Sequence, residues 1–237
     1  MSGSERLAPL TGVVFVVLTV VGIVLTSQGS PSDFPGEPAE IVEYFEENTD
    51  EIFIGTWVGI VGAFFLLWFA GSVRATLRAA EGGDGRLSAV AFGGAVTAAA
   101  MGLAIDVTNL AGAFRADEDG QIETATATTL YDLQASFLTA GLPIGIAVFI
   151  GATGLVALRT GVLPKWLGIV SVLLVIPLLI PIIAWAVTGL ALLWALAVSI
   201  MLYLRQPKAP AAGATRVGEG PPPAAASGPP ASGPPAA

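Results

Sequence analysis

Two carboxylates and two amides stand in otherwise apolar stretches, and they are the residues of this sequence best placed to do chemistry. Asp106 and Asn109 lie in one apolar stretch, and Asp132 and Gln134 lie in the next. A charge at the centre of a bilayer costs at least about 2.5 kcal/mol, so chains keep such groups mainly for a function. Carboxylate and amide oxygens brought together can bind a cation or a polar ligand. We therefore expect these four side chains to form one polar cluster.

The depth of this cluster leaves two interpretations open. The helical rise from Leu87 to Asp106 is about 28 Å, and the rise from Asp132 to Arg159 is about 40 Å. Both values place the carboxylates near the same outer boundary of a hydrocarbon layer about 30 Å thick. The cluster is either a ligand-binding or ion-entry site, or a set of interfacial residues solvated by headgroups and water.

Most catalytic chemistry is missing from the sequence. It has no histidine and no cysteine, which removes the commonest general base, the usual haem ligand and thiolate metal ligands. Tyr131 and Asp132 form a pair similar to that of intramembrane aspartyl proteases. Those enzymes need a second aspartate, in a Gly-x-Gly-Asp motif on the following helix, whereas Asp106 comes earlier and follows Gly-Leu-Ala-Ile. No nucleotide-binding or hydrolase motif occurs, so we expect no enzyme, no cofactor and no bound metal.

The elements that must position the cluster follow from composition. Hydrophobic residues make up 54% of the 237 residues and charged residues only 12%, against about 25% charged in soluble domains. Apolar stretches of about 20 residues recur, and each can cross the hydrocarbon core as a helix. We therefore expect an all-α, polytopic transmembrane helix bundle whose partner is the lipid bilayer and not nucleic acid.

Residues 1–205 are predicted to form this bundle with six spans. Trp166–Leu204 would measure about 58 Å as one helix, so we expect it to fold back at Pro177 and Pro181. The expected spans are 7–26, 52–73, 87–113, 130–158, 164–180 and 182–204. The first could instead be a cleaved signal peptide, although it is longer than usual and lacks an Ala-x-Ala site.

Two segments lie outside the expected spans. The acidic stretch 38–50 has Ile41, Tyr44 and Phe45 at helical spacing, which predicts an external amphipathic helix. Residues 206–237 are rich in Pro, Ala and Gly and predict a disordered cytoplasmic tail, because such a segment buries too little to offset its ordering entropy.

Basic residues predict the orientation. With six crossings, nine of the ten Lys and Arg residues fall on one side and Arg115 alone falls on the other. Basic loops stay in the cytoplasm, so both termini are predicted to be cytoplasmic and the acidic loops external. Because the composition is typical of bacteria with GC-rich genes, we expect a multi-pass protein of the bacterial cytoplasmic (plasma) membrane. The nine residues are Arg6, Arg74, Arg78, Arg86, Arg159, Lys165, Arg205, Lys208 and Arg216.

Small residues and one proline within the expected spans indicate how the helices pack. The pairs Gly55/Gly59 and Gly141/Gly145 let helix backbones approach closely, either within the chain or at the seam of a homo-oligomer. Pro143 lies between the second pair and is the best candidate for a helix break.

Three segments carry a resemblance to a known family. They are PAEIVEYFEENTD at 38–50, FAGSVRATLRAAEG at 69–82 and GVLPKWLGIVSVLL at 161–174. The sequence resembles an uncharacterised family of six-helix bacterial integral membrane proteins, a domain of unknown function. The resemblance covers Gly36 to about Leu204 and implies the six-helix architecture, but no reaction, cofactor or functional residue.

Two function classes remain. The first is a non-enzymatic structural, sensory or partner-binding membrane protein, favoured by the lack of catalytic groups. The second is a small transporter or channel with a polar site at the outer ends of spans three and four. A cavity at Pro143 that opens to Asp106 would favour transport, and a dry, tightly packed interior would favour the first class.

Overall fold

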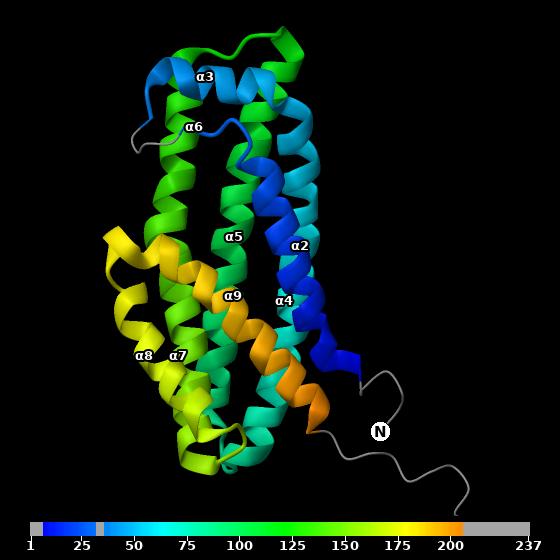
Figure 1. Ribbon diagram of the computed structural model, residues 1–237, viewed down its shortest axis with the longest axis vertical. Helices are drawn as coiled ribbons and strands as arrows, with labels where there is room; N and C mark the ends of the chain where they lie inside the picture. Colours follow the sequence, from blue (N-terminus) through cyan, green and yellow to red (C-terminus); the bar gives the residue numbers. More distant parts are fainter. Residues whose placement is uncertain (1–6, 32–35, 206–237) are drawn as a thin grey trace, which may run out of the picture. The chain divides into compact units, whose positions relative to one another are not determined.

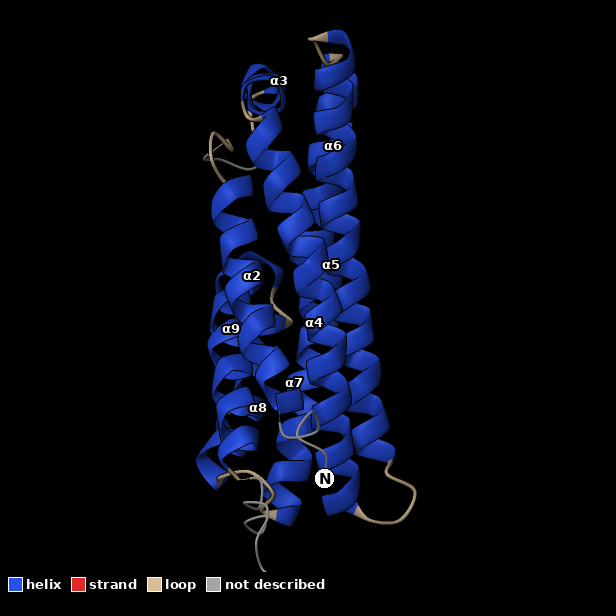
Figure 2. Ribbon diagram, turned by 90° about the vertical axis from the view of Figure 1, so that its right-hand side faces the viewer, coloured by secondary structure: helices blue, strands red, loops and turns tan. Residues whose placement is uncertain are grey.

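The computed structural model describes residues 7–31 and 36–205, which form helices joined by short turns (Figures 1 and 2). These described residues contain no strand. The predicted all-α architecture is therefore confirmed for them. The predicted disordered tail at 206–237 lies outside the described residues.

Three helical stretches are much longer than a bilayer crossing requires. They are α4 (Thr49–Glu81), α5 (Arg86–Asp119) and the continuous stretch from α6 (Thr124–Ser136) through the π-helix η2 (Phe137–Gly141) into α7 (Leu142–Thr160). Each measures about 50 Å or more, against about 30 Å of hydrocarbon.

These helices extend beyond the predicted spans, because the polar residues that flank the apolar stretches are helical as well. The first turn of α4 contains Asp50 and Glu51, which suit a helix N-terminus. The helices end only where glycine adopts a positive φ, at Gly82 after α4, Gly120 after α5 and Gly161 after α7.

The other helices are shorter. They are the 3-10 turn η1 (Ala8–Leu10), α2 (Thr11–Thr26), α3 (Pro38–Glu47), α8 (Lys165–Leu178) and α9 (Pro181–Leu204). The helix expected at 38–50 ends at Glu47, because Asn48 leaves the helical conformation and α4 begins at Thr49.

Five helices among the described residues are long and apolar enough to cross a membrane. The expected span at 164–180 is not one of them: α8 has 14 residues and measures about 21 Å. Two prolines explain its length. Pro177 and Pro181 lack the N–H that would continue one helix into the next, and the N–H of Leu179 and of Ile180 are satisfied within the turn by the carbonyls of Val175 and Pro177.

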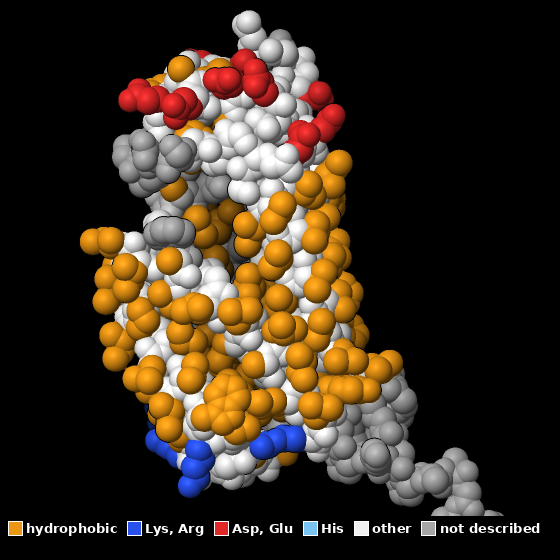
Figure 3. All heavy atoms as spheres, viewed as in Figure 1, with side chains coloured by type: hydrophobic (Ala, Val, Ile, Leu, Met, Phe, Trp, Pro, Cys, Tyr) orange, Lys and Arg blue, Asp and Glu red, His pale blue; other side chains and the backbone are white. Residues whose placement is uncertain are grey.

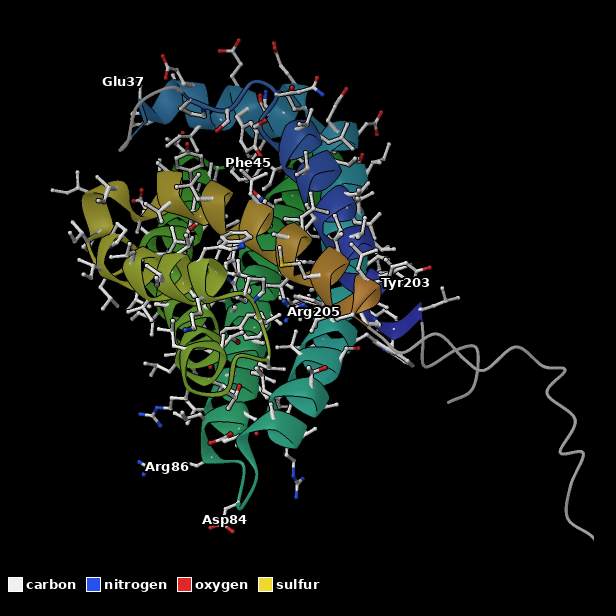
Figure 4. The ribbon with its side chains drawn as sticks, turned by 60° about the horizontal axis from the view of Figure 1, so that its bottom comes forward. Glu37, Phe45, Asp84, Arg86, Tyr203 and Arg205 are labelled. Carbon is white, nitrogen blue, oxygen red and sulfur yellow. The ribbon has the colours of Figure 1, made fainter. Side chains whose placement is uncertain are left out.

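The helices pack as a sequence of antiparallel neighbours (Figure 1). Helix α2 lies on α4, α4 on α5, α5 on α7 and α7 on α8, and the tilted α9 then crosses between α7 and α2. Figure 3 shows Lys and Arg side chains at one end, Asp and Glu at the other, and apolar side chains between. Figure 4 shows Arg86 at the first end and Glu37 at the second. We call these the basic end and the acidic end, and the halves next to them the basic half and the acidic half.

The basic half is closely packed. A Cβ atom placed on Gly145 would lie 2.4 Å from the backbone nitrogen of Ala98, so the α5 and α7 backbones are in contact there. Phe69, Phe149 and Trp194 form a chain of edge-to-face rings with centroids 6.2 and 5.5 Å apart. The buried indole N–H of Trp194 donates to Oγ of Ser171 at 2.7 Å. Polar groups in this half therefore have partners.

A second, smaller core lies at the acidic end, where α3 crosses the long helices. The apolar face of α3 contributes Ile41, Tyr44 and Phe45, which pack against residues of α4, α5 and α6. The ring of Phe45, labelled in Figure 4, lies against Gly112 of α5, where a Cβ would overlap it. The hydroxyl of Tyr44 donates to the Thr26 carbonyl at the end of α2, 2.8 Å away. Helix α3 is thus attached to α2 and α5.

Candidate functional site

The α8–α9 hairpin covers only part of the bundle side. Since α8 rises about 21 Å from Lys165 at the basic end, the hairpin turns before it reaches the acidic half. Figure 3 shows the surface hollowed between the beginning of α9 and the acidic end, where Figure 1 places α2 on one side and α6 on the other. The turn itself is exposed and apolar, and Ile182 there is 84% exposed.

Helix α5 presents its interior face to this hollow. Gly102, Asp106 and Asn109 follow one another at i, i+4 and i+7 and so share a face, which continues the line of the buried Ala95 and Ala98. Neighbouring helices cover this part of α5 incompletely, as shown by the partial exposure of all residues from 101 to 106. A Cβ on Gly102 would meet no atom within 4 Å. The hollow therefore reaches α5 beside Asp106.

The Asp106 carboxylate lies against the backbone of α4. A Cβ on Gly59 would lie 2.9 Å from Oδ1 of Asp106, so the glycine makes room for the carboxylate. The one ion pair among the described residues joins Arg115 to Glu118 near the acidic end. No described cation of the chain therefore neutralises Asp106.

Three buried side-chain oxygens on α4, α5 and α6 have no hydrogen-bond partner among the described residues: Oγ1 of Thr56, Oδ1 of Asn109 and Oε1 of Gln134. Thr56 is fully buried and Asn109 is 2% exposed. An unsatisfied buried polar group costs about 1–3 kcal/mol, so such groups are rare in packed proteins and point to a missing partner.

The helix register brings these oxygens to one level. Gly59 of α4 lies beside Asp106 of α5. Because the two helices are antiparallel, a step of one turn from this pair toward the acidic end leads to Thr56 on α4 and to Asn109 on α5, which are therefore at the same level. On the other side of α5, Gly141 lies beside Met101. Two turns further along the same pairing, Gln134 of α6 also comes level with Asn109. The candidate site thus consists of Thr56, Asp106, Asn109 and Gln134, from three helices.

A π-helical turn adjoins the site. Pro143 has no N–H and its ring crowds the carbonyl four residues earlier, that of Thr139. The turn widens in response, and the N–H of Leu142 bonds to the carbonyl of Phe137 instead. Pro143 therefore does not break the helix as expected; the chain stays helical through η2. Such turns occur frequently at functional sites.

The helix register places Asn109 and Gln134 at one level, about one turn from Asp106, and leaves Asp132 outside this group. Asp132 is exposed because it is two residues from Gln134 and so faces away from it. Sequence reasoning missed Thr56, although its place beside Gly55 in a glycine-spaced helix was a usable signal.

The depth of Asp106 also differs from the expectation. Exposed apolar side chains on α5 continue past it to Val107 and Phe114. Phe114 lies eight residues further on, about 12 Å. Asp106 therefore lies within the apolar belt and not at its edge.

Two shallow depressions at the acidic end are weaker candidates. One is lined by Val42, Glu43 and Glu46 on α3 with Thr124, and the other by Thr126, Thr129 and neighbours on α6. Both are wide open, and neither contains a buried polar group without a partner. No group of three potential metal ligands occurs among the described residues.

No protein-family model, curated protein or solved structure matches the chain. The site must therefore be interpreted from its own chemistry.

Proposed function

We propose that this chain is a non-enzymatic multi-pass membrane protein that binds a positively charged small ligand at Asp106, Asn109, Gln134 and Thr56. The observation that carries the proposal is a carboxylate beside a hollow, about one helical turn from the level of three buried oxygens that have no partner among the described residues. Oxygen acceptors with no opposing cation favour a ligand that brings positive charge and hydrogen-bond donors. The site has no nucleophile and base in contact, so binding accounts for it better than catalysis.

The proposal includes an orientation in the bacterial cytoplasmic membrane. The basic end faces the cytoplasm, because basic residues flanking spans stay inside, and the acidic end with α3 faces out. The ends of α2 and α9 that lead to the two termini lie at the basic end in Figure 1. This side assignment holds whether α8 and α9 count as two short crossings, giving six spans, or as one hairpin that enters and leaves on the same side. Membership of the six-helix family that the sequence resembles is part of the same proposal.

Transport is the second candidate function, and the π-helix η2 favours it. A widened turn beside a buried polar cluster can shift by a residue and change which side chains face the interior. The closely packed basic half would then be the inner gate of the carrier.

Thermal unfolding of the purified full chain tests the binding site. The probes are the chlorides of sodium, calcium, methylammonium and octylammonium. We expect at least one cation to raise the Tm of the wild type and to leave the Tm of Asp106→Asn unchanged, because a ligand that binds only the folded state stabilises it.

Asp132→Asn is the matched control, since it removes an equal charge from an exposed position on the neighbouring helix. It should respond to the cations as the wild type does. If no cation shifts the wild type, or if Asp106→Asn shifts equally, the binding proposal is wrong. If a cation does stabilise the wild type through Asp106, its uptake into proteoliposomes would show a carrier, and the absence of uptake would show a receptor.

The orientation can be tested on a chain that has no native cysteine. A membrane-impermeant maleimide should label Glu43→Cys in intact cells and Asp84→Cys only after permeabilisation. The opposite pattern would reverse the assigned orientation.

A further inference from the structure

We infer that the ligand is an amphiphile with a protonated amine, which reaches Asp106 sideways from the lipid. This inference rests on the proposed binding function and adds the ligand class and the route. Three features carry it: the hollow is covered toward the acidic end, its described rim toward the apolar belt is aliphatic, and the partly exposed carboxylate of Asp106 faces no described cation.

The cover at the acidic end has several attachments. Helix α3 is held to α2 by the bond from Tyr44 to the Thr26 carbonyl and to the segment before α6 by the bond from the Ile122 N–H to Glu46 at 3.0 Å. The segment after α2 is joined to α6 through the hydroxyls of Ser30 and Tyr131, 3.4 Å apart. A ligand coming straight from water would have to pass this cover.

Toward the apolar belt, the described residues that border the hollow are aliphatic. Below the hollow lies the hairpin turn, whose exposed residues Leu179, Ile180 and Ile182 are all apolar. Beside it lies α2, which exposes Val20, Val21, Ile23 and Val24 along its last turns. A rim of aliphatic side chains suits acyl chains and offers nothing to a hydrated ion.

The groups at the back of the hollow specify the head of the amphiphile. An alkylammonium has three N–H donors and a positive charge, which match the partly exposed Asp106 carboxylate. A sulfate or carboxylate head would bring a negative charge against the negative charge of Asp106. A purely apolar ligand would leave the Asp106 carboxylate without a partner.

Chain length provides the test. In nanodiscs of phosphatidylcholine, methyl-, butyl-, octyl- and dodecylammonium chloride are titrated against the full chain, with the stabilisation that depends on Asp106 as readout. Each methylene raises partitioning into the bilayer about fourfold, so a site reached from lipid should show the same slope in its apparent affinity. Dodecyl sulfate at matched membrane concentration should give no stabilisation that depends on Asp106.

Two glycine variants locate the bound molecule. Gly102→Leu fills the hollow, whereas Gly93→Leu adds the same side chain to the exposed face of the same helix. Neither added Cβ meets an atom within 4 Å, so both variants should fold. We expect Gly102→Leu to weaken dodecylammonium binding at least tenfold and Gly93→Leu to change it less than twofold.

The outcomes separate the two claims. If methylammonium binds in an Asp106-dependent way as tightly as dodecylammonium, the lipid route is wrong and the binding site stands. If Gly102→Leu and Gly93→Leu behave alike, the hollow is not the place of binding and the inference is wrong. If no amine stabilises the wild type more than Asp106→Asn, this inference fails. The site itself then stands or falls with the sodium and calcium titrations.

Discussion

The basic and acidic halves of the bundle use the same long helices in opposite ways. In the basic half, Gly94 and Gly145 bring the α5 and α7 backbones into contact, and the buried indole of Trp194 has its partner in Ser171. In the acidic half, Gly59 makes room for a carboxylate and Gly102 faces empty space. Gly145 closes a contact between helices whereas Gly102 adjoins open space, so a small residue in a membrane helix indicates packing only when its neighbour is known.

The largest expected effect separates two glycines of this kind. Gly145→Leu would drive a side chain into the α5 backbone, 2.4 Å from its first added carbon, and overpacking that cannot relax costs about 3 kcal/mol or more. We expect little folded protein from this variant, measured by detergent-solubilised yield and size-exclusion chromatography. Gly102→Leu should be recovered at wild-type yield. Equal yields would contradict the contrast between the halves.

The next effect tests whether the acidic end has a core of its own. Phe45 is fully buried, and truncating such a ring costs about 3–5 kcal/mol. Phe45→Ala should raise amide hydrogen exchange in α3 and in the ends of α4 and α5 that it covers. Exchange in α7 and α9 should stay unchanged, because their contacts lie in the basic half. A uniform increase would show that the two cores unfold together.

A smaller effect compares buried hydroxyls. Ser171 accepts from Trp194 in the basic half, so Ser171→Ala should lower the unfolding free energy by about 1–2 kcal/mol. Thr56 has a buried hydroxyl oxygen without a partner, so Thr56→Val should leave stability unchanged or raise it by about 1 kcal/mol. Unfolding in SDS titrations measures both. A loss of stability in Thr56→Val would mean that its hydroxyl is already satisfied.

The smallest effect is a pH dependence at the acidic end. Burial raises the pKa of Tyr44 above its ordinary value of 10.0, and the neighbouring Tyr131 adds to the shift. A raised pKa means that the folded state holds the proton longer, so the stabilisation is complete below pH 10 and is lost as pH rises toward the folded pKa. We expect a loss of about 1 kcal/mol between pH 9 and 11. Tyr44→Phe, which lacks the bond to Thr26 at every pH, should not show this further loss.

Sequence reasoning located the helices well and their ends poorly. Hydropathy predicts where a helix can meet lipid, but α4 and α5 continue through acidic turns until Gly82 and Gly120 stop them. The turn at Pro177 and Pro181 was predictable because proline chemistry is local. That α8 is too short to cross followed from the same residues, yet only the structure shows which side of the bundle is left uncovered.

The candidate site was predictable in part for a similar reason. Asp106, Asn109 and Gln134 could be chosen because polar residues in apolar stretches are rare. Their common level depends on the register between helices, which depends on contacts such as Gly59 with Asp106 and Gly141 with Met101. Asp132 was wrongly grouped with them as a neighbour, since two positions along a helix point to different faces. Thr56 carries no charge, and its grouping with these residues depends on the same register between helices.

The proline turn between α8 and α9 bears on how the protein is assembled. Trp166–Leu204 contains no charged residue, both ends of the hairpin lie at the basic end, and the amides of Leu179 and Ile180 are bonded within the turn. Insertion of this hairpin requires no charged group to be translocated across the bilayer. The hairpin can therefore enter and leave the bilayer on the side of the basic end without moving a charge through the hydrocarbon.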